Sequence, residues 1–333
     1  MKKRIAILGS AVAFLATSGL ATADTTLRFA YVHSPKSPPG HVAEMFREKV
    51  EASTDGRVQV QTFPSSQLGN DRKLFSSARS GSVDVVMTPY PMLADIVPEL
   101  SIYVAGYMFN GFDEQQQILE HPDLGKAWAE RLREEGGLRV LCSFLYGTRH
   151  LTTSDTPVKS REDLAGLKIR AVPHPSSMSV VRGLGGTPTP VPFSEIFQGL
   201  QQGVIDGQEN PLSTIDRQRI YEVQDYLMLT GHQLVALPVA INERAWQELD
   251  EQDRDAVQAA ADESCEVGTR LTQEEEAELV NAFTERGMQV IAPEDGLDLA
   301  AFKEAVRAEV AETFDGEIWP EGTSDAVSSA LGR

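Results

Sequence analysis

The sequence predicts an α/β fold in two lobes with a largely parallel sheet. Three observations lead to this prediction. Strand-like segments alternate with helical patterns at the spacing typical of α/β proteins. The alternation restarts after Tyr146-Gly147. Residues 251–286 then form one helical pattern, weakened only at Gly268, which is too long for a single small domain and is suited to bracing two.

The N-terminus has the order of a secretory signal peptide. Residues 2–4 are basic, residues 5–20 are mostly apolar with small residues among them, and Ala21-Thr22-Ala23 supplies an A-x-A cleavage site. The alternative is a membrane anchor, but a spanning helix needs about 20 unbroken apolar residues. Polar residues dilute the end of this run, so we expect cleavage near Ala23 and a periplasmic location.

The first half of the mature chain predicts strands and helices in turn. Residues 26–32 alternate as a strand does, and the Pro-Pro-Gly segment at residues 38–40 opens a helix with an apolar face. Residues 57–63 are again strand-like. A helix is expected over residues 71–79, and residues 82–87 form a further strand.

The same order returns in the second half. Residues 160–163 (SRED) resemble a capping box and precede a strand over residues 167–172. A helix follows over residues 176–184, and Ser194 is expected to cap the next one. Residues 204–207 (VIDG) are predicted as a short buried strand that ends in a turn.

The net charge argues against two classes of partner. The chain carries −19 at pH 7, and −22 once the three basic residues of the signal peptide are removed. A strongly acidic surface repels nucleic acid and anionic membranes. We therefore expect no nucleic-acid partner. The charge does not exclude an anionic ligand, because a local cationic pocket can lie inside an acidic body.

The two cysteines leave two possibilities open. Cys142 and Cys265 could pair in an oxidising compartment. Cys142 lies in the apolar run 138–145, which favours a buried, unpaired thiol over a disulfide. Neither cysteine has a His or another Cys at ligand spacing, so the sequence predicts no metal site.

Sequence signatures of catalysis are missing. The chain has no G-x-S-x-G nucleophile elbow, H-E-x-x-H motif, P-loop or EF-hand loop. Residues 183–186 (GLGG) are better explained as a turn than as a dinucleotide loop, because Pro188 holds the last glycine position and the segment follows a helix. His150, His174 and His232 lack neighbours for a triad. The sequence thus predicts a protein that is not an enzyme and needs no cofactor.

Basic and amide residues stand at predicted strand ends. Arg149 follows a Tyr-Gly-Thr segment, Arg170 follows Leu-Lys-Ile, and Asn210 follows Asp-Gly-Gln-Glu. Ligands of open α/β sheets bind beyond the carboxyl ends of the strands. An arginine there holds a carboxylate through two parallel hydrogen bonds. The alternative for each arginine is a surface ion pair.

Five motif regions occur in one order along the chain. They are PSSQLGND at residues 64–71, GTR at 147–149, GLKIR at 166–170, PTP with FSE at 188–195, and GVIDGQENP at 203–211. Together they resemble the solute-binding proteins of tripartite ATP-independent periplasmic (TRAP) transporters, which include sialic-acid and dicarboxylate binders. The resemblance covers essentially the whole mature chain, and it favours a ligand role for Arg170 over a surface ion pair.

The resemblance implies a periplasmic binding-protein fold, in which two α/β lobes joined by a hinge and a long bridging helix close over a small organic acid. Lobe I would comprise residues 24–146 and 235–275, and lobe II residues 147–234 and 276–333. The expected partners are the ligand and the membrane permease subunits of the transporter. The protein itself is expected to be a monomer.

The resemblance also assigns roles to residues of lobe II. Arg170 matches the arginine that pairs with the ligand carboxylate in this family. Arg149 and Asn210 match further binding residues, and Phe193 matches an aromatic wall of the pocket.

Lobe I should contribute residues from three loops, and we expect His33, Asp71 and Tyr90 there. The sialic-acid binders carry a glutamate where Pro89 stands, which points away from sialic acid. Asp71 would accept hydrogen bonds from hydroxyl groups but repel a second carboxylate. A polyhydroxylated monocarboxylate, such as a uronic or aldonic acid, is therefore expected ahead of a C4-dicarboxylate or a keto acid.

Three other readings belong to different classes of protein. A binding protein of an ATP-driven importer would share the architecture, although the motif set speaks against it. A periplasmic hydrolase would need a nucleophile or metal site that the sequence lacks. A ligand-reporting subunit of a sensor would differ in its membrane partner, a kinase in place of a permease.

Overall fold

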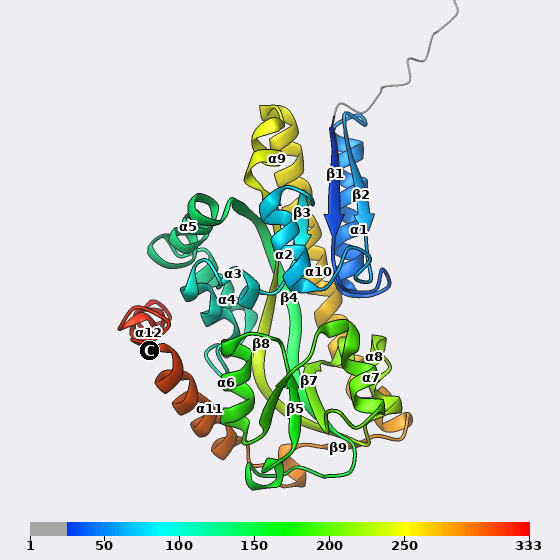
Figure 1. Ribbon diagram of the computed structural model, residues 1–333, viewed down its shortest axis with the longest axis vertical. Coiled ribbons are helices and arrows are strands. Elements are labelled where there is room, and N and C mark those ends of the chain that lie inside the picture. Colours follow the sequence, from blue (N-terminus) through cyan, green and yellow to red (C-terminus); the bar gives the residue numbers. More distant parts are fainter. Residues whose placement is uncertain (1–24) are drawn as a thin grey trace, which may run out of the picture.

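The computed structural model describes residues 25–333 of the chain. The signal peptide predicted over residues 1–23 lies outside the described residues. Helices cover both faces of one central sheet, in the mixed α/β arrangement that the sequence predicts (Figure 1). None of the helices between residues 25 and 333 is long and apolar enough to cross a membrane.

The central sheet has nine strands. Eight of them follow the order β2-β1-β3-β8-β4-β7-β5-β6, and β9 pairs with the N-terminal end of β8. The short strands pair in parallel with one another, whereas β4 and β8 are long and antiparallel. The sheet is therefore mixed, whereas the sequence predicts a largely parallel one. The strands are β1 Thr25–Ala30, β2 Val58–Phe63, β3 Val85–Met87, β4 Leu138–Thr153, β5 Lys168–Ala171, β6 Thr187–Pro190, β7 Gly207–Pro211, β8 Tyr226–Asn242 and β9 Gln289–Ile291.

Two lobes lie along the pair of long strands. Lobe I is built around β1, β2 and β3 at one end of β4 and β8, and lobe II around β5, β6, β7 and β9 at the other (Figure 1). The helices are α1 Pro38–Ser53, α2 Asp71–Ser80, α3 Tyr90–Leu93, α4 Phe112–Leu119, α5 Ala127–Gly136, α6 Pro175–Leu184, α7 Ile196–Gln201, α8 Leu212–Arg217, α9 Glu243–Glu248, α10 Glu251–Glu285, α11 Leu299–Phe314 and α12 Thr323–Ala330.

The long helix α10 spans both lobes. It begins at its N-cap Asp250, whose carboxylate accepts the Asp253 N–H at 2.8 Å. Its first half packs on α1 and β4, and its second half reaches α8 and β9 (Figure 1). The helix therefore braces the two lobes, as its length suggests from the sequence.

Two predictions about local structure are wrong. Residues 204–206 are not a strand: Gly203 ends α7 with φ +66°, and the side chain of Val204 is 52% exposed, so β7 begins only at Gly207. Ser194 does not cap α7, because a 3-10 turn over Phe193–Glu195 precedes that helix and no side chain caps it. In both places the geometry of a turn decides the local structure, and a short apolar or polar pattern does not predict it.

The preference for unpaired thiols is also wrong. Cys142 in β4 and Cys265 in α10 form a disulfide. The apolar run around Cys142 does bury much of that strand, but it also faces the small-residue side of α10, where Ala261 and Cys265 pack in the same apolar cluster. The sequence pattern indicated burial correctly but could not show which element covers the strand.

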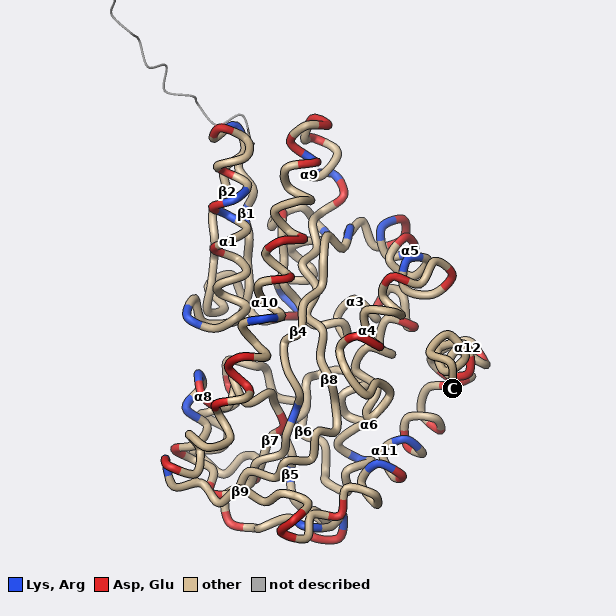
Figure 2. The backbone as a smooth tube through the Cα atoms, turned by 180° about the vertical axis from the view of Figure 1, so that it is seen from behind, with Lys and Arg blue, Asp and Glu red and all other residues tan. Residues whose placement is uncertain are grey.

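Acidic residues are distributed along the helices of both lobes and not gathered on one element. Figure 2 shows Asp and Glu interleaved with Lys and Arg along α1, α5 and α11. Several of these charges pair within one helix, as Arg47 does with Glu44 and Glu51. Such pairs solvate the surface and each contributes only about 0.3–0.5 kcal/mol.

Candidate functional site

A buried cavity between the lobes gathers most of the residues that the sequence singles out. Lobe I contributes from the end of β1 and the start of α2, and lobe II from β5, β7 and the loop before α7. Six of the seven predicted binding residues line it. The lining comprises Val32, His33, Asp71, Pro89, Tyr146, Arg149, Arg170, Val172, Phe193, Asn210, Val235 and Leu237.

Arg170 brings an unneutralised charge to this cavity. It lies in β5, its side chain is 2% exposed, and its Nε donates to the main-chain oxygen of Val191 at 2.9 Å. Among residues 25–333 no carboxylate lies within ion-pair distance of it. Burial, and after it the charge of Arg149, lowers the pKa of the guanidinium to about 10, against the opposing charges of Glu209 and Asp71. A buried cation in this state favours an anionic partner.

Arg149 carries the same charge in a different setting. Its guanidinium forms a two-point ion pair with the carboxylate of Glu209, with Nη2 at 2.9 Å from Oε1. His232 lies on the other side of that carboxylate, with Nε2 3.2 Å from Oε2. Burial alone would raise the pKa of Glu209, but Arg149 and the hydrogen bond from His232 lower it to about 2. The charge of Arg149 is therefore already balanced inside the protein.

The placement of Arg149 differs from the expectation. It does not stand at a strand end but inside β4, just before a shift in the β4–β8 register between Arg149 and Leu151. Asn210 lies in β7 opposite His150 and donates its amide N–H to the side chain of Gln208. Neighbouring strands of one sheet thus bring Arg149 and Asn210 to the same cavity.

The lobe I side of the cavity has two polar atoms without partners. Asp71 is the first residue of α2, which its neighbour Asn70 caps by accepting the Lys73 N–H at 3.0 Å. Oδ1 of Asp71 and Nδ1 of His33 are buried and form no hydrogen bond within the described chain. Burial raises the pKa of Asp71 to about 6, against the opposing charge of Arg170, and lowers the pKa of His33 to about 3.

Aromatic rings close one side of the cavity. The His33 ring lies 5.2 Å from the Phe193 ring and 5.0 Å from the Tyr146 ring, measured between centroids. The Tyr146 hydroxyl is hydrogen-bonded to Thr214 of α8. These contacts join His33 of lobe I to lobe II, and Phe193 lines the cavity beside the His33 ring.

Tyr90 is the predicted residue that the structure does not bring to this cavity. Its hydroxyl lies 2.8 Å from Oγ of Ser143, and its ring packs on Tyr103 at 4.5 Å between centroids, at a separate pocket in lobe I. Pro89, the residue before it, lines the interlobe cavity instead. The chain turns into the short helix α3 at this point, so successive side chains face opposite sides.

Three polar residues of the site were not singled out from the sequence. Tyr146 lines the cavity, while Glu209 and His232 hold Arg149. Two of them had a signal, since Tyr146 directly precedes the GTR motif and Glu209 lies inside GVIDGQENP. His232 had none, because its partner is distant in sequence and comes close only through the β4–β7–β8 pairing.

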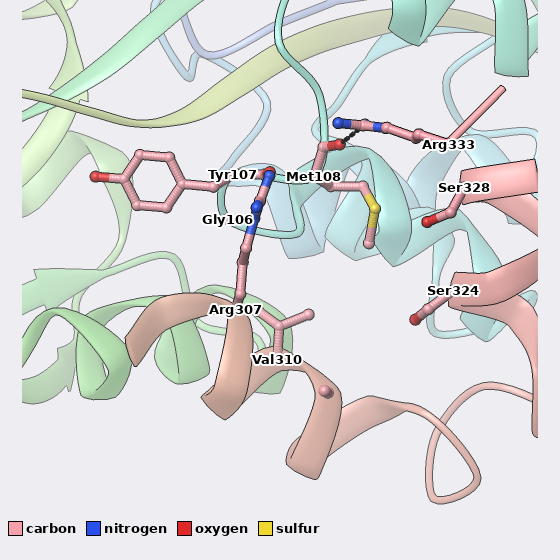
Figure 3. Close-up of a pocket in the computed structure, with 9 residues that line it drawn as sticks. Gly106, Tyr107, Met108, Arg307, Val310, Ser324, Ser328 and Arg333 are labelled. Atoms are coloured by element: carbon pink, nitrogen blue, oxygen red, sulfur yellow. Dashed lines mark hydrogen bonds between the residues drawn. The ribbon is translucent and has the colours of Figure 1, made fainter. Parts of the chain in front are cut away.

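A further pocket lies between α11, α12 and residues 106–108 (Figure 3). Its two arginines are engaged by main-chain oxygens: Arg307 donates to Tyr107 at 3.0 Å, and Arg333 donates to Met108. Ser324 and Ser328 add hydroxyl groups (Figure 3). None of the predicted binding residues lines this pocket.

Two α/β lobes with a buried, unneutralised arginine in the cavity between them define the class of two-lobed solute-binding proteins. The comparison with protein families agrees. The chain belongs to the bacterial extracellular solute-binding proteins, family 7 (DctP), whose model matches residues 29–317. It is a solute-binding protein of the TRAP type.

Individual relatives extend over nearly the whole chain. The sialic acid-binding periplasmic protein SiaP of Vibrio cholerae is 32% identical over 92% of this chain and 94% of its own length. A TRAP solute-binding protein of Roseobacter denitrificans with bound L-galactonate is 30% identical, with a TM-score of 0.86 over 93% of this chain and all of that one. One of Sulfurospirillum deleyianum with bound succinate is 26% identical, with a TM-score of 0.85 over 93% of this chain and 100% of that one.

Proposed function

We propose that this protein captures a polyhydroxylated monocarboxylate, such as an aldonic or uronic acid, in the periplasm. The proposal rests on the state of Arg170. It is buried, charged and without an anionic partner among the described residues, and its planar guanidinium suits a carboxylate held through two hydrogen bonds. The L-galactonate held by the Roseobacter denitrificans relative is an acid of this class.

The opposite side of the cavity supports hydroxyl groups over a second carboxylate. It offers Oδ1 of Asp71 as an acceptor and Nδ1 of His33 as a ring nitrogen, and neither atom has a hydrogen-bond partner within residues 25–333. A ligand hydroxyl could donate to Asp71 and exchange a hydrogen bond with His33. A second carboxylate would meet the charge of Asp71, and Arg149, the other arginine of the cavity, is already paired with Glu209.

The proposed role is delivery of this acid to membrane permease subunits, by a protein that binds and does not convert its ligand. The family is one of transporter binding proteins, which supports a permease as partner. The signal peptide predicted over residues 1–23 supports export, with cleavage near Ala23. N-terminal sequencing of the protein recovered from the periplasm tests that cleavage site.

A thermal-shift screen tests the ligand class. The panel contains L-galactonate, gluconate, glucuronate and galacturonate, against succinate, malate, pyruvate and sialic acid. A ligand at a hundred times its Kd stabilises the folded protein by about 2.7 kcal/mol, which is readily measured as a rise in Tm. Stabilisation by sugar acids is the expected result. Stabilisation by succinate or malate alone would show that the lobe I side accepts a second carboxylate.

A further inference from the structure

The long strand β4 is irregular where it passes from one lobe to the other. Its pairing with β8 shifts in register between Leu145 and Gly147 and again between Arg149 and Leu151. Gly147 has φ +139°, a backbone conformation that L side chains rarely adopt. Residues 145–149 are therefore the segment of β4 at which the lobes join, and we call them the β4 hinge.

Two side chains of α10 replace part of the regular strand bonding in the β4 hinge. The Leu145 N–H donates to Oγ1 of Thr269 at 3.1 Å, and the Thr148 N–H donates to Oε1 of Glu276 at 2.7 Å. Such main-chain donors are costly to bury without an acceptor. The bridging helix thus holds the hinge strand through its main chain, two turns apart.

Two of the five residues of the β4 hinge also line the ligand cavity. Tyr146 and Arg149 line the cavity, and they alternate with the residues whose N–H groups α10 accepts. Space around the hinge is tight: a side chain at Gly147 would come within 2.5 Å of Oε1 of Glu276 and 2.7 Å of Pro211. A movement of Glu276 would therefore move the strand on which Arg149 stands.

The carboxyl of Glu276 lies in a setting that disfavours its charge. Burial raises its pKa to about 7, the Thr148 N–H opposes the shift, and the neighbouring charge of Glu275 adds to it. Glu275 is itself paired with Arg217 of α8 at 2.6 Å, so that cation is already engaged. Among residues 25–333, Glu275 is the charged group that bears on the pKa of Glu276.

We propose that Glu276 is a positioning residue of the hinge, which holds the strand segment bearing Tyr146 and Arg149 and makes closure of the lobes depend on pH. The carboxyl is half-buried in this arrangement, where it accepts the Thr148 N–H, and opening at the β4 hinge would expose it further to water. The proposal goes beyond the proposed function, because it concerns the hinge and holds for any ligand bound in the interlobe cavity.

The sign of the pH effect follows from the two environments. In the closed form the pKa of Glu276 is about 7, and hydration in the open form returns it towards the ordinary value of 4.5. Between these values the closed form binds more protons, so closure becomes more favourable as the pH falls. Ligand affinity should therefore increase up to about tenfold between pH 8 and pH 6, and become constant above pH 8.

Two measurements test the proposal, one of them without ligand. Hydrogen exchange of the ligand-free protein follows the amides of residues 145–149 in the wild type, Glu276→Gln and Glu276→Ala. We expect at least tenfold faster exchange at Thr148 in Glu276→Ala, and near-normal protection in Glu276→Gln, whose amide oxygen still accepts. Equal protection in all three would overturn the role of Glu276 at the hinge.

Calorimetry with L-galactonate from pH 5.5 to 8.5 supplies the second measurement. The wild type should bind more tightly as the pH falls, and Glu276→Gln should lose that component. Glu278→Gln, an exposed residue of the same helix, is the matched control and should keep the wild-type profile. A shared profile for wild type and Glu276→Gln would overturn the pH dependence. Absence of L-galactonate binding would instead contradict the proposed ligand class, while the exchange result still decides on the hinge.

Discussion

Two arginines line the same cavity, and only one of them is paired with a carboxylate of the described chain. Arg149 is balanced by Glu209 and fixed further by His232, so it serves as a rigid neutral unit. Arg170 has no such partner among the described residues, and only its Nε is used, on a main-chain oxygen. The ligand carboxylate is therefore expected at Arg170, because a new ion pair there removes an uncompensated buried charge.

Replacing Arg170 should weaken binding more than any other single change in the cavity. Arg170→Ala is expected to cost about 2–5 kcal/mol, the range for removing one partner of a buried charge pair. Arg170→Lys should recover little, because an ammonium cannot form the planar pair of hydrogen bonds. Calorimetry measures both, with Arg182→Ala as control, since Arg182 is an exposed residue paired with Glu309. Near-normal affinity in the lysine variant would contradict pairing through two hydrogen bonds.

The carboxylate of Asp71 should lower the stability of the ligand-free protein and raise its affinity for the ligand. Its pKa is raised from 3.8 to about 6, so the folded state binds the proton more tightly than the unfolded state. The resulting destabilisation is complete above pH 6 and disappears towards pH 4. Asp71→Asn is therefore expected to raise the Tm of the ligand-free protein at pH 8, and to raise it much less at pH 4.5.

The same variants test the hydroxyl role of Asp71. Asp71→Ala should cost about 1–3 kcal/mol of L-galactonate binding, since it leaves a ligand hydroxyl without an acceptor. Asp71→Asn should lose less, because its amide oxygen still accepts. Unchanged affinity in Asp71→Ala, measured by calorimetry, would place the hydroxyl groups elsewhere in the cavity.

At the scale of secondary structure, α10 is held to lobe I by a covalent bond and to the hinge by hydrogen bonds. The disulfide joins Cys265 to Cys142 in the lobe I half of β4, and Thr269 and Glu276 follow one and three turns later. The first half of the helix is thereby fixed to one lobe. Movement of the lobes must then be accommodated beyond this point, at the β4 hinge.

Removing the disulfide should lower stability without changing the ligand site. The bond closes a loop of 123 residues in the sequence, and a native disulfide of this kind contributes about 2–5 kcal/mol. The double variant Cys142→Ser, Cys265→Ser should therefore unfold at lower urea concentration than the wild type, and reductant should shift only the wild type. Coincident curves for oxidised and reduced wild type would show that the bond does not constrain the unfolded chain.

At the scale of the whole molecule, a small group of contacts joins the lobes at the rim of the cavity. Asp95 after α3 pairs with Arg72 at 3.1 Å and lies 3.5 Å from Nε2 of His174, which caps α6 in lobe II. Arg72 also donates to the main-chain oxygen of Pro173 at 3.2 Å. These residues adjoin Asp71 and the strand of Arg170, so closing the rim and binding the ligand involve the same two loops.

Breaking the rim contacts should release the ligand sooner. Asp95→Ala is expected to raise the dissociation rate about two- to fivefold, the effect of losing one exposed ion pair with Arg72 and a polar contact with His174 that would form only on closure. Stopped-flow measurements with L-galactonate give this rate. Glu309→Ala removes a comparable exposed pair with Arg182 inside lobe II and is the control. A control variant that accelerates release equally would show that the rim has no special part in closure.

Closure itself should be visible in solution. Two lobes around one buried ligand require an opening for entry, and the ligand favours the closed form through contacts made only there. Small-angle scattering should give a smaller radius of gyration with L-galactonate than without it. Superimposable curves at saturating ligand would contradict a hinge motion.

The C-terminal segment does not follow the proposed lobe boundaries simply, because it returns to lobe I. The proposed division at residue 146 falls within the irregular β4 hinge, and the proposed division near residue 275 falls where α10 contacts α8. The last residues, however, return to the first lobe: Trp319 donates to Pro98 at 3.1 Å, and Gln117 donates to Ala330 at 2.6 Å. The segment after α11, which the proposed boundaries assign to lobe II, thus contacts lobe I.

The sequence alone was sufficient for the alternation of strands and helices, the long α10, the α2 helix beginning at Asp71, and the cationic character of the site. Each depends on local patterns or on motifs whose residues are close in sequence, such as GLKIR around Arg170. Tertiary structure decided how Cys142 finds Cys265, why Arg149 is balanced by Glu209 and His232, and why Tyr90 faces away from the cavity. These depend on which distant segments β4, β8 and α10 bring together, and local periodicity does not encode distances between segments that are far apart along the chain.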